Sequence, residues 1–214
     1  MWNEEQLASV AGISGEDGRG TFYNPPAIRM QGKTGVVTLY LGKGEDKKTE
    51  TLKFPLDVVF LKHRSQIVNA YKPSKTPKPS YFSSEFDAHN DLVSVMRRNA
   101  GEAKLDTIAT GLTIDKAKEF IFQQSKNEAK HEKVLYVLFG GEVRKLYLKG
   151  GSMAPYFDYL KAVKASGVAH SFMVTTQLTD SGLVKNEAGM EYHHFVFTKA
   201  GESNPSVVAP KMKE

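Results

Sequence analysis

The stretch 134-VLYVLFGGEVRKLYLK-149 decides the fold of this chain, because its turn fixes which side chains share a face of the sheet. Two glycines separate two runs of β-forming residues, and both can take the positive φ that a two-residue hairpin turn requires. In that register Phe139 lies opposite Glu142, and Tyr136 lies opposite Lys145. Opposed residues point to the same side of a sheet, so the turn divides the hairpin into two faces.

The two faces differ in chemistry. One is apolar and predicts a core made of Leu135, Val137, Phe139, Leu146 and Leu148. The other combines rings and cations, and consists of Tyr136, Lys145, Tyr147 and Lys149 together with Val134, Leu138 and Val143. Rings that stack on unpaired bases, beside cations that neutralise phosphates, are typical of single-stranded nucleic-acid binding. The alternative is an ordinary exposed sheet face, because tyrosine is common in strands and lysine is common on their edges.

A second segment, 58–84, repeats this chemistry and contains no acidic residue. Its cations are Lys62, Arg64, Lys72, Lys75 and Lys78, with His63 beside them, and its candidate stacking rings are Tyr71, Tyr81 and Phe82. Lys62 and Arg64 have the same strand parity and would share a face. The Pro-rich stretch KPSKTPKP cannot join a sheet ladder and predicts a loop. The alternative is a loop that only aids solubility.

The remaining pattern predicts a mainly β protein with a few helices. Strands are expected over 36–41, 52–71, 92–96, 172–178 and 191–199, and the second of these needs one bulge because its apolar alternation changes phase. Residues 113–133 predict a helix with Thr113 as its N-cap and with Ile114, Ala117 and Ile121 at helical spacing. Residues 152–166 predict another helix, with Met153, Phe157 and Leu160 on one face.

The expected organisation is a flexible arm over 1–34, one domain over 35–200 and a disordered tail over 201–214. The net charge of +5 weakly favours an anionic partner. The chain has no cysteine, which excludes disulfides and thiolate sites and suits a reducing compartment. The sequence shows neither a secretory signal nor an apolar run of the ~20 residues that a membrane helix needs, so we expect a cytoplasmic protein without membrane contact.

Acidic and histidine residues form two other candidate sites. The segment 84-SEFDAHND-91 contains the candidate metal ligands Glu85, Asp87, His89 and Asp91, but a metal site needs ligands that converge from several elements. We therefore expect a polar turn. His193 and His194 are adjacent and would point to opposite faces of a strand. Neither a phosphate-binding glycine loop nor a Gly-x-Ser-x-Gly motif is present, so no enzyme activity, metal or cofactor is expected.

The order of elements carries a resemblance. The block VLYVLFGGEVRKLYLKGGSMAPYFDYLKAV, followed by a strand pair that ends EYHHFVFTK, places a short helix among the strands of a barrel, as in OB-folds. With the earlier segments VVTLYL, FPLDVVFLKHRSQIV and LVSVM, residues 35–199 resemble the OB-fold single-stranded DNA-binding proteins of tailed bacteriophages. Many proteins of that class end in an acidic tail, whereas this sequence ends VVAPKMKE.

The resemblance implies an OB-like β-barrel and sequence-independent binding of single-stranded DNA in replication, recombination or repair, in the host cytoplasm if the protein is phage-encoded. Binding of RNA stays open, because no residue pattern reports on the 2′-hydroxyl, and so does oligomeric or cooperative assembly on DNA. Two rival hypotheses remain: a metal-dependent nuclease that uses Glu85, Asp87 and Asp91, and a phage accessory protein that binds a protein partner.

Overall fold

The computed structural model describes residues 25–41, 48–69, 78–100 and 104–212. These residues are mainly β-strand, as the sequence predicts. The described residues divide into two compact units: the first comprises residues 25–41, 48–63 and 135–212, and the second comprises residues 64–69, 78–100 and 104–134. The sequence pattern predicted one domain over 35–200, and the described part of that range contributes to both units. No change of composition marks the division, because it falls inside two long strands.

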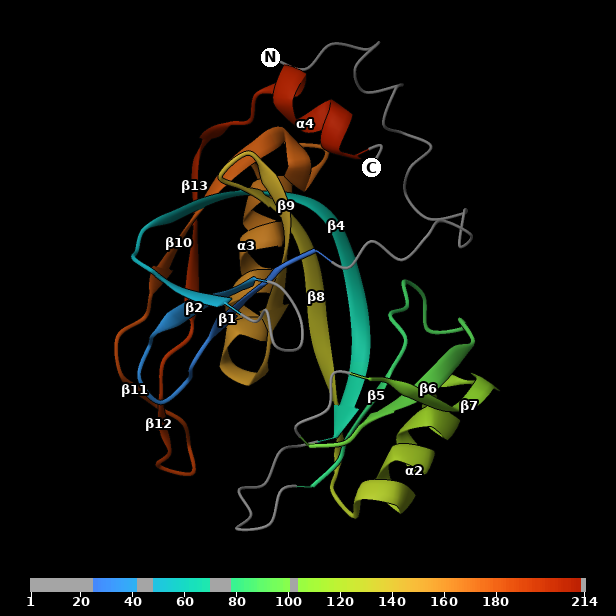
Figure 1. Cartoon of the computed structure of the whole chain (residues 1–214). Helices are drawn as coiled ribbons and strands as arrows, with labels where there is room; N and C mark the ends of the chain where they lie inside the picture. Colours follow the sequence, from blue (N-terminus) through green and yellow to red (C-terminus); the bar gives the residue numbers. More distant parts are fainter. Residues whose placement is uncertain (1–24, 42–47, 70–77, 101–103, 213–214) are drawn as a thin grey trace. The chain divides into compact units, whose positions relative to one another are not determined.

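The first unit is built on a large sheet (Figure 1). In pairing order its strands are β3 (Lys48–Leu52), β2 (Val37–Leu41), β1 (Ala27–Met30), β9 (Glu142–Leu148), β8 (Ala129–Phe139), β4 (Leu56–Asn69), β10 (Val174–Asp180) and β13 (Phe195–Glu202). A small hairpin of β11 (Val184–Lys185) and β12 (Glu191–Tyr192) connects β10 to β13. β1 pairs in parallel with β9 and antiparallel with β2. The described strands do not close into a barrel, because β1 occupies the edge of β9.

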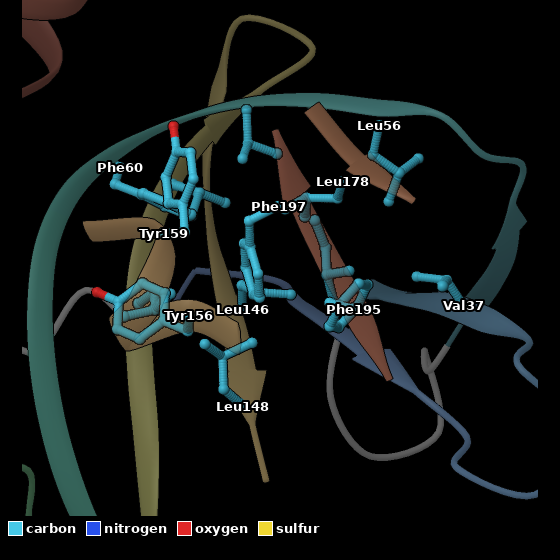
Figure 2. Close-up of a cluster of buried hydrophobic side chains, with 14 of the residues drawn as sticks. Val37, Leu56, Phe60, Leu146, Leu148, Tyr156, Tyr159, Leu178, Phe195 and Phe197 are labelled. Carbon is cyan, nitrogen blue, oxygen red and sulfur yellow. The ribbon is translucent and has the colours of Figure 1, made fainter. Parts of the chain in front are cut away.

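Helix α3 (Met153–Ala165) follows a short 3₁₀ turn, η2 (Gly150–Ser152), and packs into the main core of this unit. Figure 2 shows β4 arching over a cluster of aromatic and aliphatic side chains from the sheet and from α3. The ring of Phe60, 0% exposed, lies with its centroid 5.7 Å from that of Tyr156 and 6.2 Å from that of Phe197. The Tyr159 hydroxyl hydrogen-bonds the Thr176 hydroxyl at 2.6 Å, which satisfies both polar groups inside the core.

The buried side of α3 differs from the one that its sequence predicts. Tyr156, Tyr159 and Val163 are buried, whereas Phe157 is 41% exposed. Met153 and Leu160 pack at the margin of the core. Helical spacing allows either stripe, and the tyrosine stripe is buried because its hydroxyls find partners inside the core.

β4 changes the parity of its inward side chains between Phe60 and His63. Both rings lie beside Tyr156, with centroids 5.7 and 5.9 Å from it. Residues separated by an odd number of positions point to opposite faces of a regular strand, and Leu61 lies in a different cluster on the other face. The bulge predicted from the apolar pattern would produce such a change of parity.

In the second unit the strands pair in the order β8, β4, β5 (Ser80–Ser83), β6 (Val93–Arg98) and β7 (Asp106–Leu112). Helix α2 (Ile114–Ser125) packs against β5, β6 and β7. Thr113 caps it by accepting a hydrogen bond from Lys116 N–H, as predicted. The buried residues of this core are Ile67, Phe86, Val93, Val95, Ile114, Ala117 and Ile121.

Helix α2 is shorter than predicted. It ends at Ser125 and is capped by Lys126, whose φ of 54° is left-handed, and β8 begins at Ala129. The chain over 205–212, predicted to be disordered, forms helix α4 (Pro205–Met212). Part of the predicted N-terminal arm is likewise ordered, as β1. No helix of the described residues is long and apolar enough to span a bilayer.

Candidate nucleic-acid interface

The β8–β9 hairpin has the predicted turn. Gly140 and Gly141, with φ of 60° and 79°, lie between the strand ends Phe139 and Glu142. Four residues of the predicted inner face are 0% exposed in the main core: Leu135, Val137, Leu146 and Leu148. Tyr136 and Tyr147 lie outside that core and are half-buried, so the assignment of faces holds.

Lys145 departs from the expected exposed surface, because its side chain is only 7% exposed. Ala27 of β1 pairs opposite Lys145, and Lys145 N–H donates to the Pro26 carbonyl at 2.9 Å. Lys145 Nζ lies 5.2 Å from the ring centroid of Tyr136, within cation–π range. Strand parity predicted the correct face of the sheet for Lys145. It did not predict that the side chain is buried, because the burial depends on the neighbouring strand β1.

Arg29 of β1 lies on the candidate interface, although the sequence pattern did not indicate it. Its guanidinium carbon lies 4.1 Å from the ring centroid of Tyr147. Ile28, beside it, is 0% exposed and points into the core, so Arg29 points outward. The alternation in 27-AIRM-30 was the available signal, but the surrounding glycines and prolines favoured a loose arm.

Helix α4 covers part of the same outer face. Its Val208, 1% exposed, packs in a cluster with Val59, Leu61, Leu138 and Val143, and Tyr136 packs at the margin. Ser203 fixes the entry to the helix by donating from its hydroxyl to the Phe172 carbonyl at 2.6 Å. The outer face therefore has an apolar part under α4 and a cationic part near β1 and β9, where Arg29 and Lys149 are exposed.

In the second unit, Tyr81 and Phe82 point to opposite faces of β5. Tyr81 packs against the core under α2, which does not favour the stacking role predicted for it. Phe82 pairs across the sheet with Val68 and Met96, and the Arg98 guanidinium carbon lies 5.5 Å from its ring centroid. Adjacent strand residues alternate in direction, so the two rings could not both serve one surface.

The remaining predicted binding residues differ in their exposure and in their partners. Lys78 is exposed and Lys62 is half-buried. Arg64 Nε lies 3.3 Å from an Asp87 carboxylate oxygen, so this cation has an acidic partner from beyond the acid-free segment. The predicted binding residues Tyr71, Lys72 and Lys75 lie outside the described residues.

The acidic segment around Asp91 is the polar turn that we expected. The Asp91 carboxylate accepts hydrogen bonds from the backbone N–H groups of Asp87 and Ala88, at 2.8 and 3.0 Å. These bonds, from Ala88 first and then Asp87, hold the pKa of Asp91 below its usual value. In the part of the chain that the structure describes, no group of three or more histidine or acidic side chains could hold a metal ion.

The adjacent histidines have separate environments. His193 Nδ1 lies 2.8 Å from an Asp180 carboxylate oxygen. Burial lowers the pKa of His194, although Asp180 opposes the shift. On β4, His63 contacts the Tyr156 hydroxyl through Nδ1 and the Ser171 hydroxyl through Nε2, the latter at 2.9 Å. Desolvation raises the pKa of Tyr156, so this hydroxyl stays protonated and can donate to the imidazole.

A scan against protein-family models, a search of curated proteins and a search of solved structures each found no match for this chain.

Proposed function

We propose that this protein binds single-stranded DNA with little dependence on base sequence. The observation that carries the proposal is the stacked pair of Arg29 and Tyr147, 4.1 Å apart, on the outer face of the first unit. The second pair, Lys145 and Tyr136, lies on the neighbouring strands. Rings and cations on adjoining strands combine base stacking with phosphate neutralisation.

Arg29 does not need to leave Tyr147 for a base to bind. The guanidinium is planar, and the Arg29 side chain is exposed. Unpaired bases stack on arginine planes as well as on aromatic rings. A base can therefore extend the existing stack, while the guanidinium charge attracts a neighbouring phosphate.

The order of the strands in the sheet also favours the outer face of β8 and β9 as the binding surface. Five strands follow one another along the chain as β4, β8, β9, β10 and β13, with α3 between β9 and β10. In the sheet they pair in the order β9-β8-β4-β10-β13. This is the order of strands in an OB-fold, in which the last strand would close against β9; here β1 lies at that edge. OB-folds bind oligonucleotides on the face of their second and third strands, which correspond to β8 and β9.

The second unit offers an additional contact. Phe82 and Arg98 form an aromatic–cation pair on the face of its sheet opposite to α2, and Lys78 is exposed at the start of β5. A contact of this kind in the second unit would increase the number of neutralised phosphates. This arrangement suits a protein that coats single strands during replication, recombination or repair, and assembly of several copies on DNA belongs to the same proposal.

A titration of fluorescently labelled oligo-dT, with and without magnesium, tests the proposal. We expect saturable binding without cleavage, weaker binding of a duplex of equal length, and a fall of log K with log salt of about 0.7 per phosphate neutralised. Magnesium-dependent degradation would support the nuclease hypothesis instead, and absence of binding at low salt would leave the protein-partner hypothesis.

Two substitutions locate the interface. Tyr147→Ala should weaken binding by about 1–3 kcal/mol if a base joins its stack, and Arg29→Gln should weaken binding and reduce the salt slope. Lys161→Gln is the charge-matched control, because Lys161 is 79% exposed on α3 and pairs only with nearby Asp158 in the described structure. Equal effects of Arg29→Gln and Lys161→Gln would mean that charge acts non-specifically and that this face is not the interface.

A further inference from the structure

A pocket of about 380 Å³ opens at the end of β9 in the first unit. Lys149, Gly150 and Gly151 form one side, Gly32 of the β1–β2 turn lies at another, and residues of the β11–β12 hairpin complete it. The volume is within the range of roughly 300–1,000 Å³ that small-ligand sites occupy. Of the predicted binding residues, Lys149 alone lines it.

The walls suit a flat ligand. Glycines contribute only backbone to the surface, and the Tyr192 ring packs directly on Gly151, where an added Cβ would overlap it. Met190, 64% exposed, supplies an apolar side chain at the opening. A planar ring can contact both the tyrosine face and the methionine thioether, as aromatic and sulfur groups do in protein interiors.

Polar groups around the pocket are held in place by their neighbours. The Asn186 side-chain oxygen accepts a hydrogen bond from Met190 N–H at 2.9 Å, which leaves its amide NH₂ as a donor. The Asp180 carboxylate holds His193 Nδ1 at 2.8 Å, which leaves Nε2 as the second ring nitrogen. The pocket thus combines an aromatic wall, oriented hydrogen-bonding groups, the Lys149 cation and the Glu191 carboxylate, whose Oε1 lies 3.1 Å from Lys185 Nζ.

We propose that this pocket accepts one unpaired base of the bound single strand, with the base against Tyr192 and its phosphate near Lys149. The inference rests on the proposed function and adds a subsite to it. A planar heterocycle with polar edges beside an anion is a nucleotide, and this is the ligand that the wall, the donors and the cation match together. The pocket also continues the proposed interface, because Lys149 follows Tyr147 by two positions and has the same strand parity.

Abasic scanning tests this subsite. Each position of a short oligo-dT, trimmed to the minimum length that saturates the protein, is replaced in turn by an abasic residue. In the wild type we expect, apart from the position that stacks on Arg29 and Tyr147, one further position at which loss of the base lowers affinity roughly 5- to 150-fold, as expected for one stacked base. In Tyr192→Leu the affinity for intact oligo-dT should fall by a similar factor, and the abasic penalty at that position should disappear.

Two further variants keep the test decisive. Gly151→Ala forces the Tyr192 ring to move, so it should also remove the abasic penalty. If Tyr192→Leu fails to fold, Met190→Ala should remove the penalty without changing a core residue. Leu183→Ala is the control, because Leu183 is 57% exposed near the hairpin but does not line the pocket. If the wild type binds oligo-dT but its abasic penalties are unchanged in these variants, the subsite is wrong and the proposed function stands. If the wild type does not bind oligo-dT, both proposals fail.

Discussion

Truncation of Leu146 to alanine tests the arrangement on which the proposed interface depends. Leu146 is 0% exposed in the main core and pairs across the sheet with Ile28, also 0% exposed. Removing a fully buried leucine side chain leaves a cavity and costs about 2–5 kcal/mol. In a chain of this size each kcal/mol lowers the melting temperature by about 2–4 °C, so Leu146→Ala should melt about 4–20 °C below the wild type.

Leu183→Ala is the matched control, because it removes the same atoms from a side chain that is 57% exposed. Its free energy of unfolding should stay within about 0.5 kcal/mol of the wild-type value. Urea unfolding followed by circular dichroism measures both variants, and unchanged m-values would show that each affects stability alone. Comparable losses in the two variants, or a loss below about 1 kcal/mol in Leu146→Ala, would refute the reasoning. A slip of one residue in register exchanges the faces of the strand, and Tyr147 would then be the core residue.

Three other outcomes are expected. Tyr156→Phe should cost about 1–3 kcal/mol in urea unfolding, because it removes the buried hydroxyl that contacts the half-buried His63 ring; an unchanged midpoint would show that the contact is energetically neutral. Asp91→Ala should lower stability at neutral pH, and its deficit relative to the wild type should shrink in acid. The sign follows from the lowered pKa of Asp91: the carboxylate stabilises the fold above its unfolded-state pKa, and this contribution is lost as the pH falls through the folded-state pKa. A constant deficit across that range would contradict the role of the charge. Val208→Asp should release α4 and expose the apolar cluster on the outer face, because burying an unpaired carboxylate is costly. Increased binding of a hydrophobic dye with a preserved strand signal checks it, and unchanged dye binding would show that α4 stays in place.

The hairpin was predictable because its information is local. The glycine pair determines the turn, the turn determines the register, and alternation assigns Leu146 and Tyr147 to opposite faces. The burial of Lys145 was not predictable in this way, since it depends on β1, which lies more than a hundred residues earlier in the chain. Arg29 was missed for the same reason: only its long-range pairing places it over Tyr147.

The division into two units and helix α4 were beyond the sequence pattern. A strand that passes from one core to another shows only a change of apolar phase, and a bulge predicts the same change, so the pattern does not separate the two. Helix α4 is short and contains Pro210, so its intrinsic helix propensity is low. It is ordered because Val208 finds an apolar surface on distant strands, which is a tertiary effect that local propensity does not report.

The sharing of β4 and β8 by both units bears on the order of folding. In the first unit, the early part of β4 must pair with the late part of β8, across an intervening stretch of residues 64–134. Bringing together the ends of an unstructured loop of about 70 residues costs about 4 kcal/mol of chain entropy. That stretch is itself the second unit, in which the remaining parts of the same two strands are paired. Once it has folded, its two ends lie close together, because Lys133 Nζ donates to the Ser65 hydroxyl at 2.7 Å, and the first unit no longer bears this entropic cost. The inserted unit therefore acts as a template for the sheet that carries the proposed interface, and weakening its core at Ile121 should slow the folding of a sheet to which that residue does not belong.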